Sequence, residues 1–235
     1  MAQSKTGSRI LAAFFALGAA IIILYATGLW PGLFALFGLE EGFGETTKAH
    51  PFIMGFIKLF FLGTLGEFIK FRIARGSLDL DKVFQRAVVW GIWGLWFALA
   101  FPAFAAAVTA LVQAEPQLWP GRIGTDEDPL NFGEKLWLAF SMSLWINVLG
   151  MYALGMMVTH EYFNRLIATG WRSWSLNAFA DHSQPRFVLS FLPKTLLFWI
   201  PAHTFTFAMP GEWRVFIAAL LAIALGFFLS VGRRS

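Results

Sequence analysis

Six long apolar runs separated by polar loops are the feature that most constrains the fold of this chain. A helix that crosses about 30 Å of hydrocarbon at about 1.5 Å per residue needs about 20 mostly apolar residues. Runs close to that length lie at 10–30, 51–71, 87–111, 136–158, 187–209 and 215–231. The runs predict an all-α integral membrane protein with a single transmembrane domain over residues 1–235. We expect a bundle of six transmembrane helices, or five if residues 187–231 pack differently.

The composition also indicates a protein embedded in a lipid bilayer, and it excludes several other classes of protein. Hydrophobic residues make up 57% of the chain and charged residues 14%, whereas soluble domains are about 25% charged. The mean hydropathy is +0.63. So few charges cannot cover a water-soluble globule of this size, which excludes a cytosolic enzyme and a disordered protein. The chain has no cysteine, which excludes a disulfide scaffold and thiolate metal sites.

The basic residues are sorted by loop, and this sorting predicts the orientation. The N-terminus, the loops at about 70–86 and 159–186, and the C-terminal tail together hold 12 lysines and arginines, whereas the opposite loops hold 4. Cytoplasmic loops are the ones enriched in lysine and arginine. We therefore expect both termini to be cytoplasmic. The net charge of +4 then reports orientation, so the predicted partner is the lipid bilayer and not a nucleic acid.

Polar side chains inside the apolar runs are the candidate functional residues. A charge at membrane depth costs at least about 2.5–3.5 kcal/mol on insertion scales, so such residues usually face protein or water and often mark a pathway. The candidates for a pathway or a buried polar network are Lys58, Glu67, Asn147, Lys194, His203 and Thr206.

The depths of these residues suggest how they pair. Glu67 and Lys194 have opposite charges and lie in the same inner layer, so we predict that they approach each other across the second and fifth spans. Lys58 and His203 share the outer half of the membrane, and with Asn147 they are candidates to line a hydrated path. Lys58 and Glu67 are nine residues apart, about 180° around one helix, which weakens a simple pore with one polar face.

Each candidate also has a structural interpretation, and the sequence leaves both open. The long stems of the two lysines let their ammonium groups reach the membrane surfaces, and Glu67 lies three residues from Lys70 on the same helix. Asn147 suits a hydrogen-bonded seam between helices. His203 follows Pro201, which frees backbone groups that a neutral histidine can satisfy.

Motifs of the common enzymes are missing from the sequence. It has no His-Glu-x-x-His, no Gly-x-Ser-x-Gly, no phosphate-binding glycine loop and no carboxylate pair within one span. We therefore expect no enzymatic activity, no cofactor and no metal site.

Two stretches of the chain resemble the Mpv-seventeen/peroxisomal membrane protein family. The resemblance is carried by Trp199, Pro201, His203, Thr206, Pro210, Arg214 and Leu229-Ser230, with His50-Pro51 and Gly66-Glu67 upstream. The family has Gln, Asn and Asp where this chain has His203, Thr206 and Glu67, so the chain looks like a divergent and bacterial relative. The resemblance implies a small helical membrane protein without a catalytic site and, for some members, a weakly selective pore. It also implies structure-setting roles for Pro51, Gly66, Pro201, Pro210 and Arg214.

These observations predict a channel- or pore-like protein of a bacterial inner (plasma) membrane that passes small ions or metabolites with weak selectivity. Two alternatives stay open. One is a non-conducting accessory or scaffold subunit of a larger membrane complex, and the other is a small secondary transporter that acts as a dimer. Either a homo-oligomer or a larger membrane complex is compatible with the sequence.

Overall fold

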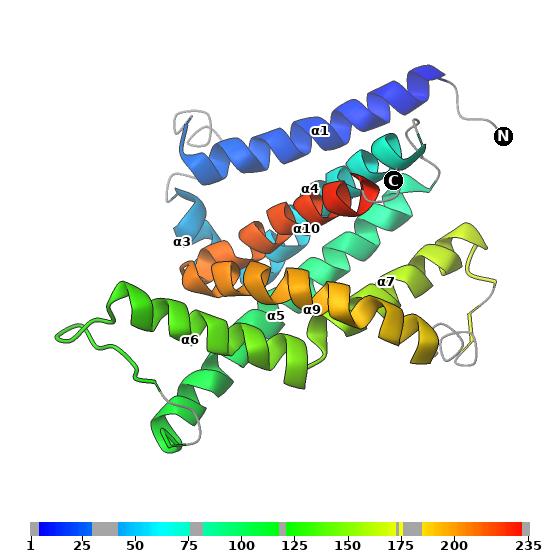
Figure 1. Ribbon diagram of the computed structural model, residues 1–235. Coiled ribbons are helices and arrows are strands. Elements are labelled where there is room, and N and C mark those ends of the chain that lie inside the picture. The colour runs from blue at the N-terminus through cyan, green and yellow to red at the C-terminus, as the bar shows by residue number, and fades with distance from the viewer. Residues whose placement is uncertain are drawn as a thin grey trace. The chain divides into compact units, whose positions relative to one another are not determined.

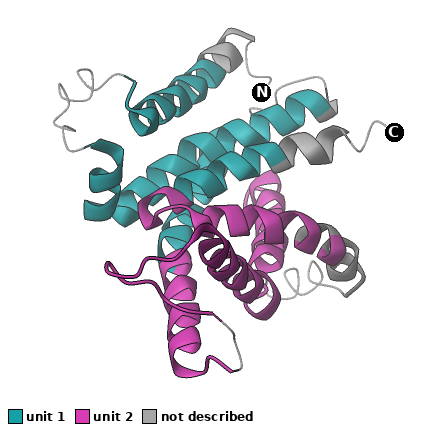
Figure 2. Ribbon diagram, turned by 60° about the vertical axis from the view of Figure 1, so that its left-hand side comes forward, with its two compact units in different colours: residues 1–99, 215–235 teal, residues 100–214 magenta. Residues whose placement is uncertain are grey.

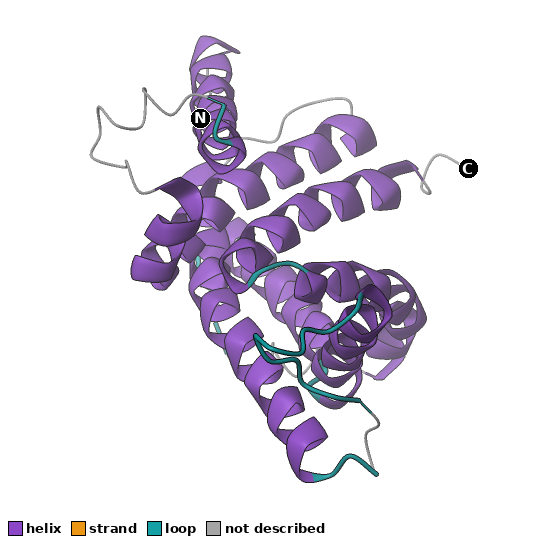
Figure 3. Ribbon diagram, turned by 90° about the vertical axis from the view of Figure 1, so that its left-hand side faces the viewer, coloured by secondary structure: helices purple, strands orange, loops and turns teal. Residues whose placement is uncertain are grey.

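The computed structural model describes residues 5–29, 42–75, 82–117, 121–172, 174–175 and 185–231. Every regular element in these residues is a helix (Figure 3), which confirms the all-α class. The chain divides into two compact units, one of residues 1–99 and 215–235 and the other of residues 100–214 (Figure 2). The single transmembrane domain over residues 1–235 stays a prediction.

In its described residues, the first unit is built from four helices and part of a fifth (Figure 1). These are α1 (Lys5–Thr27), α3 (Gly42–Ala49), α4 (Pro51–Arg75), the first part of α5 (Val83–Ala114) and α10 (Arg214–Val231). Helix α1 packs along α4, and α3 contacts both. Aromatic and aliphatic side chains from α1, α4 and α5 form the core between them, around Phe15, Phe68, Val83 and Ala87. Their burial follows from the apolar character of all three helices.

Glycines set how closely α4 and α5 approach in this unit. Gly55 and Gly94 face each other, and a side chain on Gly94 would collide with the backbone carbonyl of Gly55. Farther along the same two helices, a Cβ on Gly63 of α4 would lie 2.6 Å from the indole of Trp90 on α5. Small residues at such positions let membrane helices pack backbone to backbone.

The second unit contains the rest of α5, then α6 (Phe132–Leu144), the π-helical segment η1 (Trp145–Leu149), α7 (Tyr152–Ala168), α9 (Pro185–Ala208) and the short η2 (Gly211–Trp213). Helix α6 packs along α9, and α7 contacts α9 as well. A capping box starts α6: the side chain of Asn131 accepts from the backbone N–H of Glu134, and the Glu134 carboxylate accepts from the backbone N–H of Asn131.

The apolar run at 136–158 is not one continuous helix. The chain leaves α6 through η1, breaks at Gly150 and Met151, and resumes as α7 with a bend of 50°. Met151 has a φ of 47°, in the left-handed region, so the helical hydrogen-bond ladder stops there. In the first run, approximately 10–30, helix α1 ends at Thr27 and is followed by Gly28 with a φ of 65°.

Two helices of the described residues, Pro51–Ile73 and Val83–Ala114, are long and apolar enough to cross a membrane. The bent pair Phe132–Leu149 and Tyr152–Ala168 makes a third if it is one broken span. The runs expected at 51–71, 87–111, 187–209 and 215–231 correspond to α4, α5, α9 and α10, with ends that differ by a few residues. The chain is thus an all-helical protein with apolar helices compatible with a membrane.

Candidate functional site

A buried hydrogen-bonded pair lies beside the break in the second unit. Asn147, in the π-helical segment, is 1% exposed, and His203, on α9, is 2% exposed. Nδ2 of Asn147 lies 2.9 Å from Nδ1 of His203 and donates to the backbone oxygen of Ser143 at 2.9 Å. The hydroxyl of Ser143 donates to the backbone oxygen of Ile200 at 2.7 Å. These polar groups therefore join the broken helix to α9.

Aromatic rings surround His203. The indole of Trp199 stacks on its imidazole with 4.9 Å between ring centroids and 29° between planes. Phe101 and Tyr152 approach edge to face at 5.7 Å and 6.3 Å. Trp199 is 4% exposed, and its Nε1 has no hydrogen-bond partner. In the sequence Trp199 carries the family resemblance, but it was not among the candidate site residues.

The break itself is closely packed. Gly150 donates its backbone N–H to the oxygen of Trp145 at 2.8 Å, the i to i−5 bond of a π-helix. A Cβ at Gly150 would lie 2.6 Å from the ring of Phe104 and 2.9 Å from the backbone oxygen of Ile146, so a larger residue requires these neighbours to shift. A left-handed conformation at a non-glycine residue such as Met151 costs of order 1–3 kcal/mol and is typical of functional sites.

The residues after His203 close the end of α9. Thr206 is fully buried, and its hydroxyl donates to the backbone oxygen of Ala202 at 3.0 Å. Pro201 lies inside α9, and Pro210 follows its last turn. The guanidinium of Arg214 donates to the backbone oxygen of Met209 at 3.3 Å. A cation that binds the last carbonyls of a helix also complements its dipole.

Lys58 lies in the first unit and is fully buried on α4. Its ammonium donates to the hydroxyl of Thr47 on α3 at 2.8 Å. It also lies 4.1 Å from the ring centroid of Phe43, within the range of a cation–π interaction. The short helix α3, which the sequence did not predict, therefore supplies contacts for this lysine.

Glu67, also on α4 and 4% exposed, pairs with a residue that sequence reasoning did not consider. Nη1 of Arg86 on α5 lies 3.2 Å from Oε1 of Glu67, and the indole N–H of Trp90 donates to Oε2 at 3.4 Å. The side chain of Lys194 lies outside the described residues, so the expected pair between Glu67 and Lys194 stays a prediction.

Two residues expected to set the structure also lie in this unit. Pro51 begins α4, where a missing N–H costs nothing. A Cβ on Gly66 would lie 3.2 Å from the Cα of Ile223 on α10, so this glycine brings two helices together.

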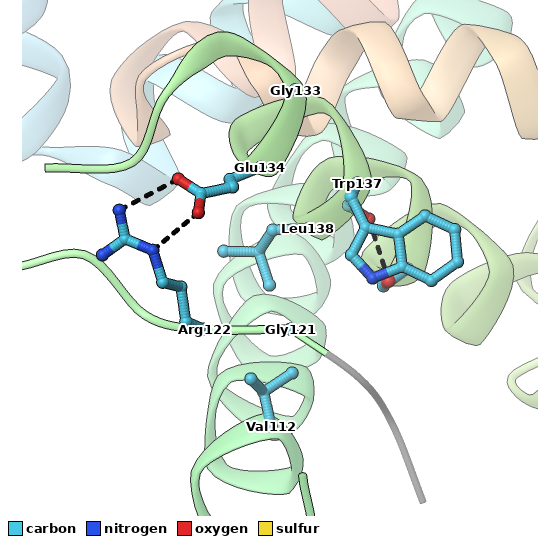
Figure 4. Close-up of a pocket in the computed structure, with 8 residues that line it drawn as sticks. Val112, Gly121, Arg122, Gly133, Glu134, Trp137 and Leu138 are labelled. Atoms are coloured by element: carbon cyan, nitrogen blue, oxygen red, sulfur yellow. Dashed lines mark hydrogen bonds and ion pairs between the residues drawn. The ribbon is translucent and has the colours of Figure 1, made fainter. Parts of the chain in front are cut away.

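A cavity of about 380 Å³ opens between the end of α5, the following loop and the start of α6 (Figure 4). Its lining residues are Val112, Gly121, Arg122, Gly133, Glu134, Trp137, Leu138 and Ser141. Arg122 holds the Glu134 carboxylate through two hydrogen bonds, of 2.7 Å and 3.0 Å. Arg122 also binds Asp128 at 2.7 Å. The walls below this pair are apolar, and sequence reasoning did not predict the cavity.

Glu134 precedes the apolar run at 136–158 by two residues. The hydrogen bonds from Arg122, and then the backbone N–H of Asn131, hold the pKa of its carboxyl below the usual value. In the described part of the chain, no three acidic or histidine side chains gather closely enough to hold a metal ion.

Comparison of the chain with protein-family models, with curated proteins and with solved structures finds no match.

Proposed function

We propose that this chain is a six-helix channel-like protein of a bacterial inner membrane, with both termini in the cytoplasm. It passes small ions or metabolites with weak selectivity, and it is a divergent relative of the Mpv-seventeen/peroxisomal membrane protein family. The observation that carries the proposal is the broken helix of the second unit, with the buried pair of Asn147 and His203 at the break.

Physical constraints on backbone in hydrocarbon support this interpretation. Lipid offers no hydrogen bonds, so non-helical backbone at membrane depth occurs only where protein buries it or where it lines a water-filled cavity. Membrane transport proteins place their solute sites at such discontinuous helices, and π-helical turns cluster at functional sites. The left-handed conformation of Met151 and the close contact of Gly150 with the ring of Phe104 add local strain at the break.

Reconstitution tests the proposal directly. Purified protein in planar bilayers should give conductance above that of protein-free membranes. In Gly150→Ala, the added Cβ meets the ring of Phe104, so we expect an altered open probability. Gly155→Ala is the matched control on α7, because nothing lies within 4 Å of its Cβ. No conductance from folded wild-type protein rejects the channel, and a Gly150→Ala variant that conducts like the wild type removes the break from the path.

The topology is tested separately, and the absence of cysteine makes single-cysteine labelling clean. In right-side-out vesicles an impermeant maleimide should label Gln117→Cys, in the loop after α5, and should not label Ser235→Cys. Labelling of both positions, or of the C-terminal position alone, contradicts six spans with cytoplasmic termini.

Burial supports a second candidate, the non-conducting accessory or scaffold subunit. Lys58, Glu67, Asn147 and His203 are each less than 5% exposed, as expected for polar groups that hold a dry bundle together. Large apolar side chains such as Leu197 and Trp96 are exposed and are available to lipid or to partner helices. The two candidates differ in one result: the scaffold predicts membranes that stay electrically silent.

A further inference from the structure

The cavity at the end of α5 has the size of a small-ligand site. Its volume of about 380 Å³ lies near the lower end of the range for ligand pockets, about 300–1,000 Å³. All of its lining residues belong to the second unit, and Val112, Trp137 and Leu138 give it an apolar wall (Figure 4). Ligand pockets are lined mostly by such side chains, with a few polar groups that orient the ligand. The wall therefore favours a ligand with an apolar group.

Gly121 leaves part of this space open. A Cβ on this residue would lie 3.5 Å from the side chain of Val112 and 3.7 Å from the indole of Trp137, which is ordinary van der Waals contact. The φ of Gly121 lies outside the left-handed region, so a residue with a side chain can adopt the same backbone conformation. A large side chain at this position would therefore fill the cavity without distorting the loop.

The charged end of the cavity, formed by Arg122 and Glu134, offers acceptors more readily than donors. The guanidinium of Arg122 makes five hydrogen bonds, as many as it has N–H groups. They go to the carboxylates of Glu134 and Asp128 and to the backbone oxygens of Asp128 and Pro129. An anion would have to displace one of these oxygens or share a hydrogen with it. The carboxylate of Asp128 is 76% exposed and accepts through Oδ2, so it keeps room for a further donor.

The net charge at this end of the cavity is negative. The single positive charge of Arg122 faces the two negative charges of Glu134 and Asp128. Asp126 and Glu127 are exposed in the same loop and add two more negative charges. A cleft with an excess of one sign raises the local concentration of ions of the opposite sign. Charge and hydrogen-bonding capacity therefore both favour a cation over an anion.

We propose that this cavity binds a monovalent organic cation that carries an apolar or aromatic group. The apolar group packs against Val112, Trp137 and Leu138, and the cationic group lies near the carboxylates of Glu134 and Asp128. Tryptophan is the side chain whose ring attracts cations most strongly, so Trp137 suits both parts of the ligand. An inorganic cation would leave the apolar wall unused. The proposal does not depend on conductance, because an electrically silent protein can still bind the cation.

Binding of benzyltrimethylammonium tests the proposal, with benzenesulfonate as an anion of similar size. Protein labelled with fluorotryptophan in uncharged maltoside micelles gives a fluorine resonance for Trp137, which is identified by its loss in Trp137→Phe. We expect a saturable shift of this resonance with benzyltrimethylammonium and none with benzenesulfonate at the same concentration. The absence of a saturable shift with the cation overturns the proposal. Equal shifts with the two probes overturn it as well, because they indicate an apolar pocket without charge selection.

Two variants with matched controls locate the site. Gly121→Leu should abolish the shift because the new side chain fills the cavity, whereas Gly155→Leu, on α7 with nothing within 4 Å of its Cβ, should bind like the wild type. Asp128→Asn removes one exposed charge and should raise the Kd of the cation by about two- to fivefold. Glu45→Gln removes a carboxylate from the exposed pair with Lys48 in the first unit and should leave the Kd unchanged. Undiminished binding in folded Gly121→Leu, or an unchanged Kd in Asp128→Asn, overturns the site. If Gly121→Leu does not fold, Asp128→Asn decides.

Discussion

Two serines of α6 allow the bonds between helices to be weighed against bonds within a helix. Ser141 and Ser143 are both fully buried. The hydroxyl of Ser143 donates to Ile200 on α9 at 2.7 Å, whereas that of Ser141 donates to Trp137 on its own helix at 2.9 Å. Replacement of either residue by alanine removes one oxygen atom. Only Ser143→Ala removes a link to another helix.

The magnitude follows from the difference between the two variants. The gain in helix propensity from serine to alanine, about 0.5 kcal/mol, is common to both and cancels. Hydrogen bonds between membrane helices contribute about 0.6 kcal/mol on average and up to about 1.7 kcal/mol. In Ser143→Ala the backbone oxygen of Ile200 still accepts a hydrogen bond from the hydroxyl of Thr204 at 2.8 Å, so it is not left without a donor. We therefore expect Ser143→Ala to be less stable than Ser141→Ala by about 1 kcal/mol.

The free energy of unfolding is to be measured by titration from mild detergent micelles into sodium dodecyl sulfate, with helical circular dichroism as the signal. Both variants and the wild type share one denatured state to a good approximation, so their midpoints are directly comparable. Equal stabilities of the two alanine variants, or a larger loss in Ser141→Ala, would refute the view that the polar side chains of α6 hold it to α9.

Three further outcomes are expected. Gly94→Ala places a methyl group against a backbone carbonyl of α4, so it should prevent folding or lower the free energy of unfolding by at least about 3 kcal/mol. Gly155→Ala should raise the free energy of unfolding by about 0.5–1 kcal/mol. The same detergent titration measures both. Removal of one partner of a buried ion pair leaves an uncompensated charge, so Glu67→Leu should be less stable than the double variant with Arg86→Leu. The pKa of Glu134 lies below its usual value when folded, so its contribution to stability is present above the usual pKa and is lost as the pH falls through the lowered one. As the pH falls through this lowered pKa, a spin label in the loop before α6 should gain mobility. Mobility that is independent of pH contradicts a structural role for the Glu134 carboxylate.

The apolar helices could be predicted from sequence because length and hydropathy determine them. The run expected at 51–71 begins at Pro51 in the structure, and the run at 215–231 differs from α10 by one residue at its start. The break at Gly150 had no comparable signal, because the run at 136–158 is uncharged and glycine is common in membrane helices. What interrupts the helix is tertiary: the ring of Phe104 against the glycine and the bond from Asn147 to α9.

The partner of Glu67 was within reach of sequence reasoning. Glu67 lies near the end of one apolar run and Arg86 just before the next, so an antiparallel pair of helices brings them to the same depth. The expectation of a partner on the fifth span came from charge and depth alone. A short connection between two runs brings their facing ends together, and this neighbour relation predicts the pair of Glu67 and Arg86; the pair of Glu67 and Lys194 stays a prediction.

Trp199 shows the limit of ranking residues by polarity. A scale that counts tryptophan as apolar selects His203 and passes over the indole stacked on it, although Nε1 of that indole is buried without a hydrogen-bond partner. In water the distinction is harmless, because solvent satisfies whatever the fold leaves over. In hydrocarbon nothing does, so a buried atom left unsatisfied carries information that the polarity of its residue does not. Nε1 of Trp199 meets that criterion, whereas the amide nitrogen of Asn147 is already bonded to the backbone oxygen of Ser143 and lies 2.9 Å from Nδ1 of His203.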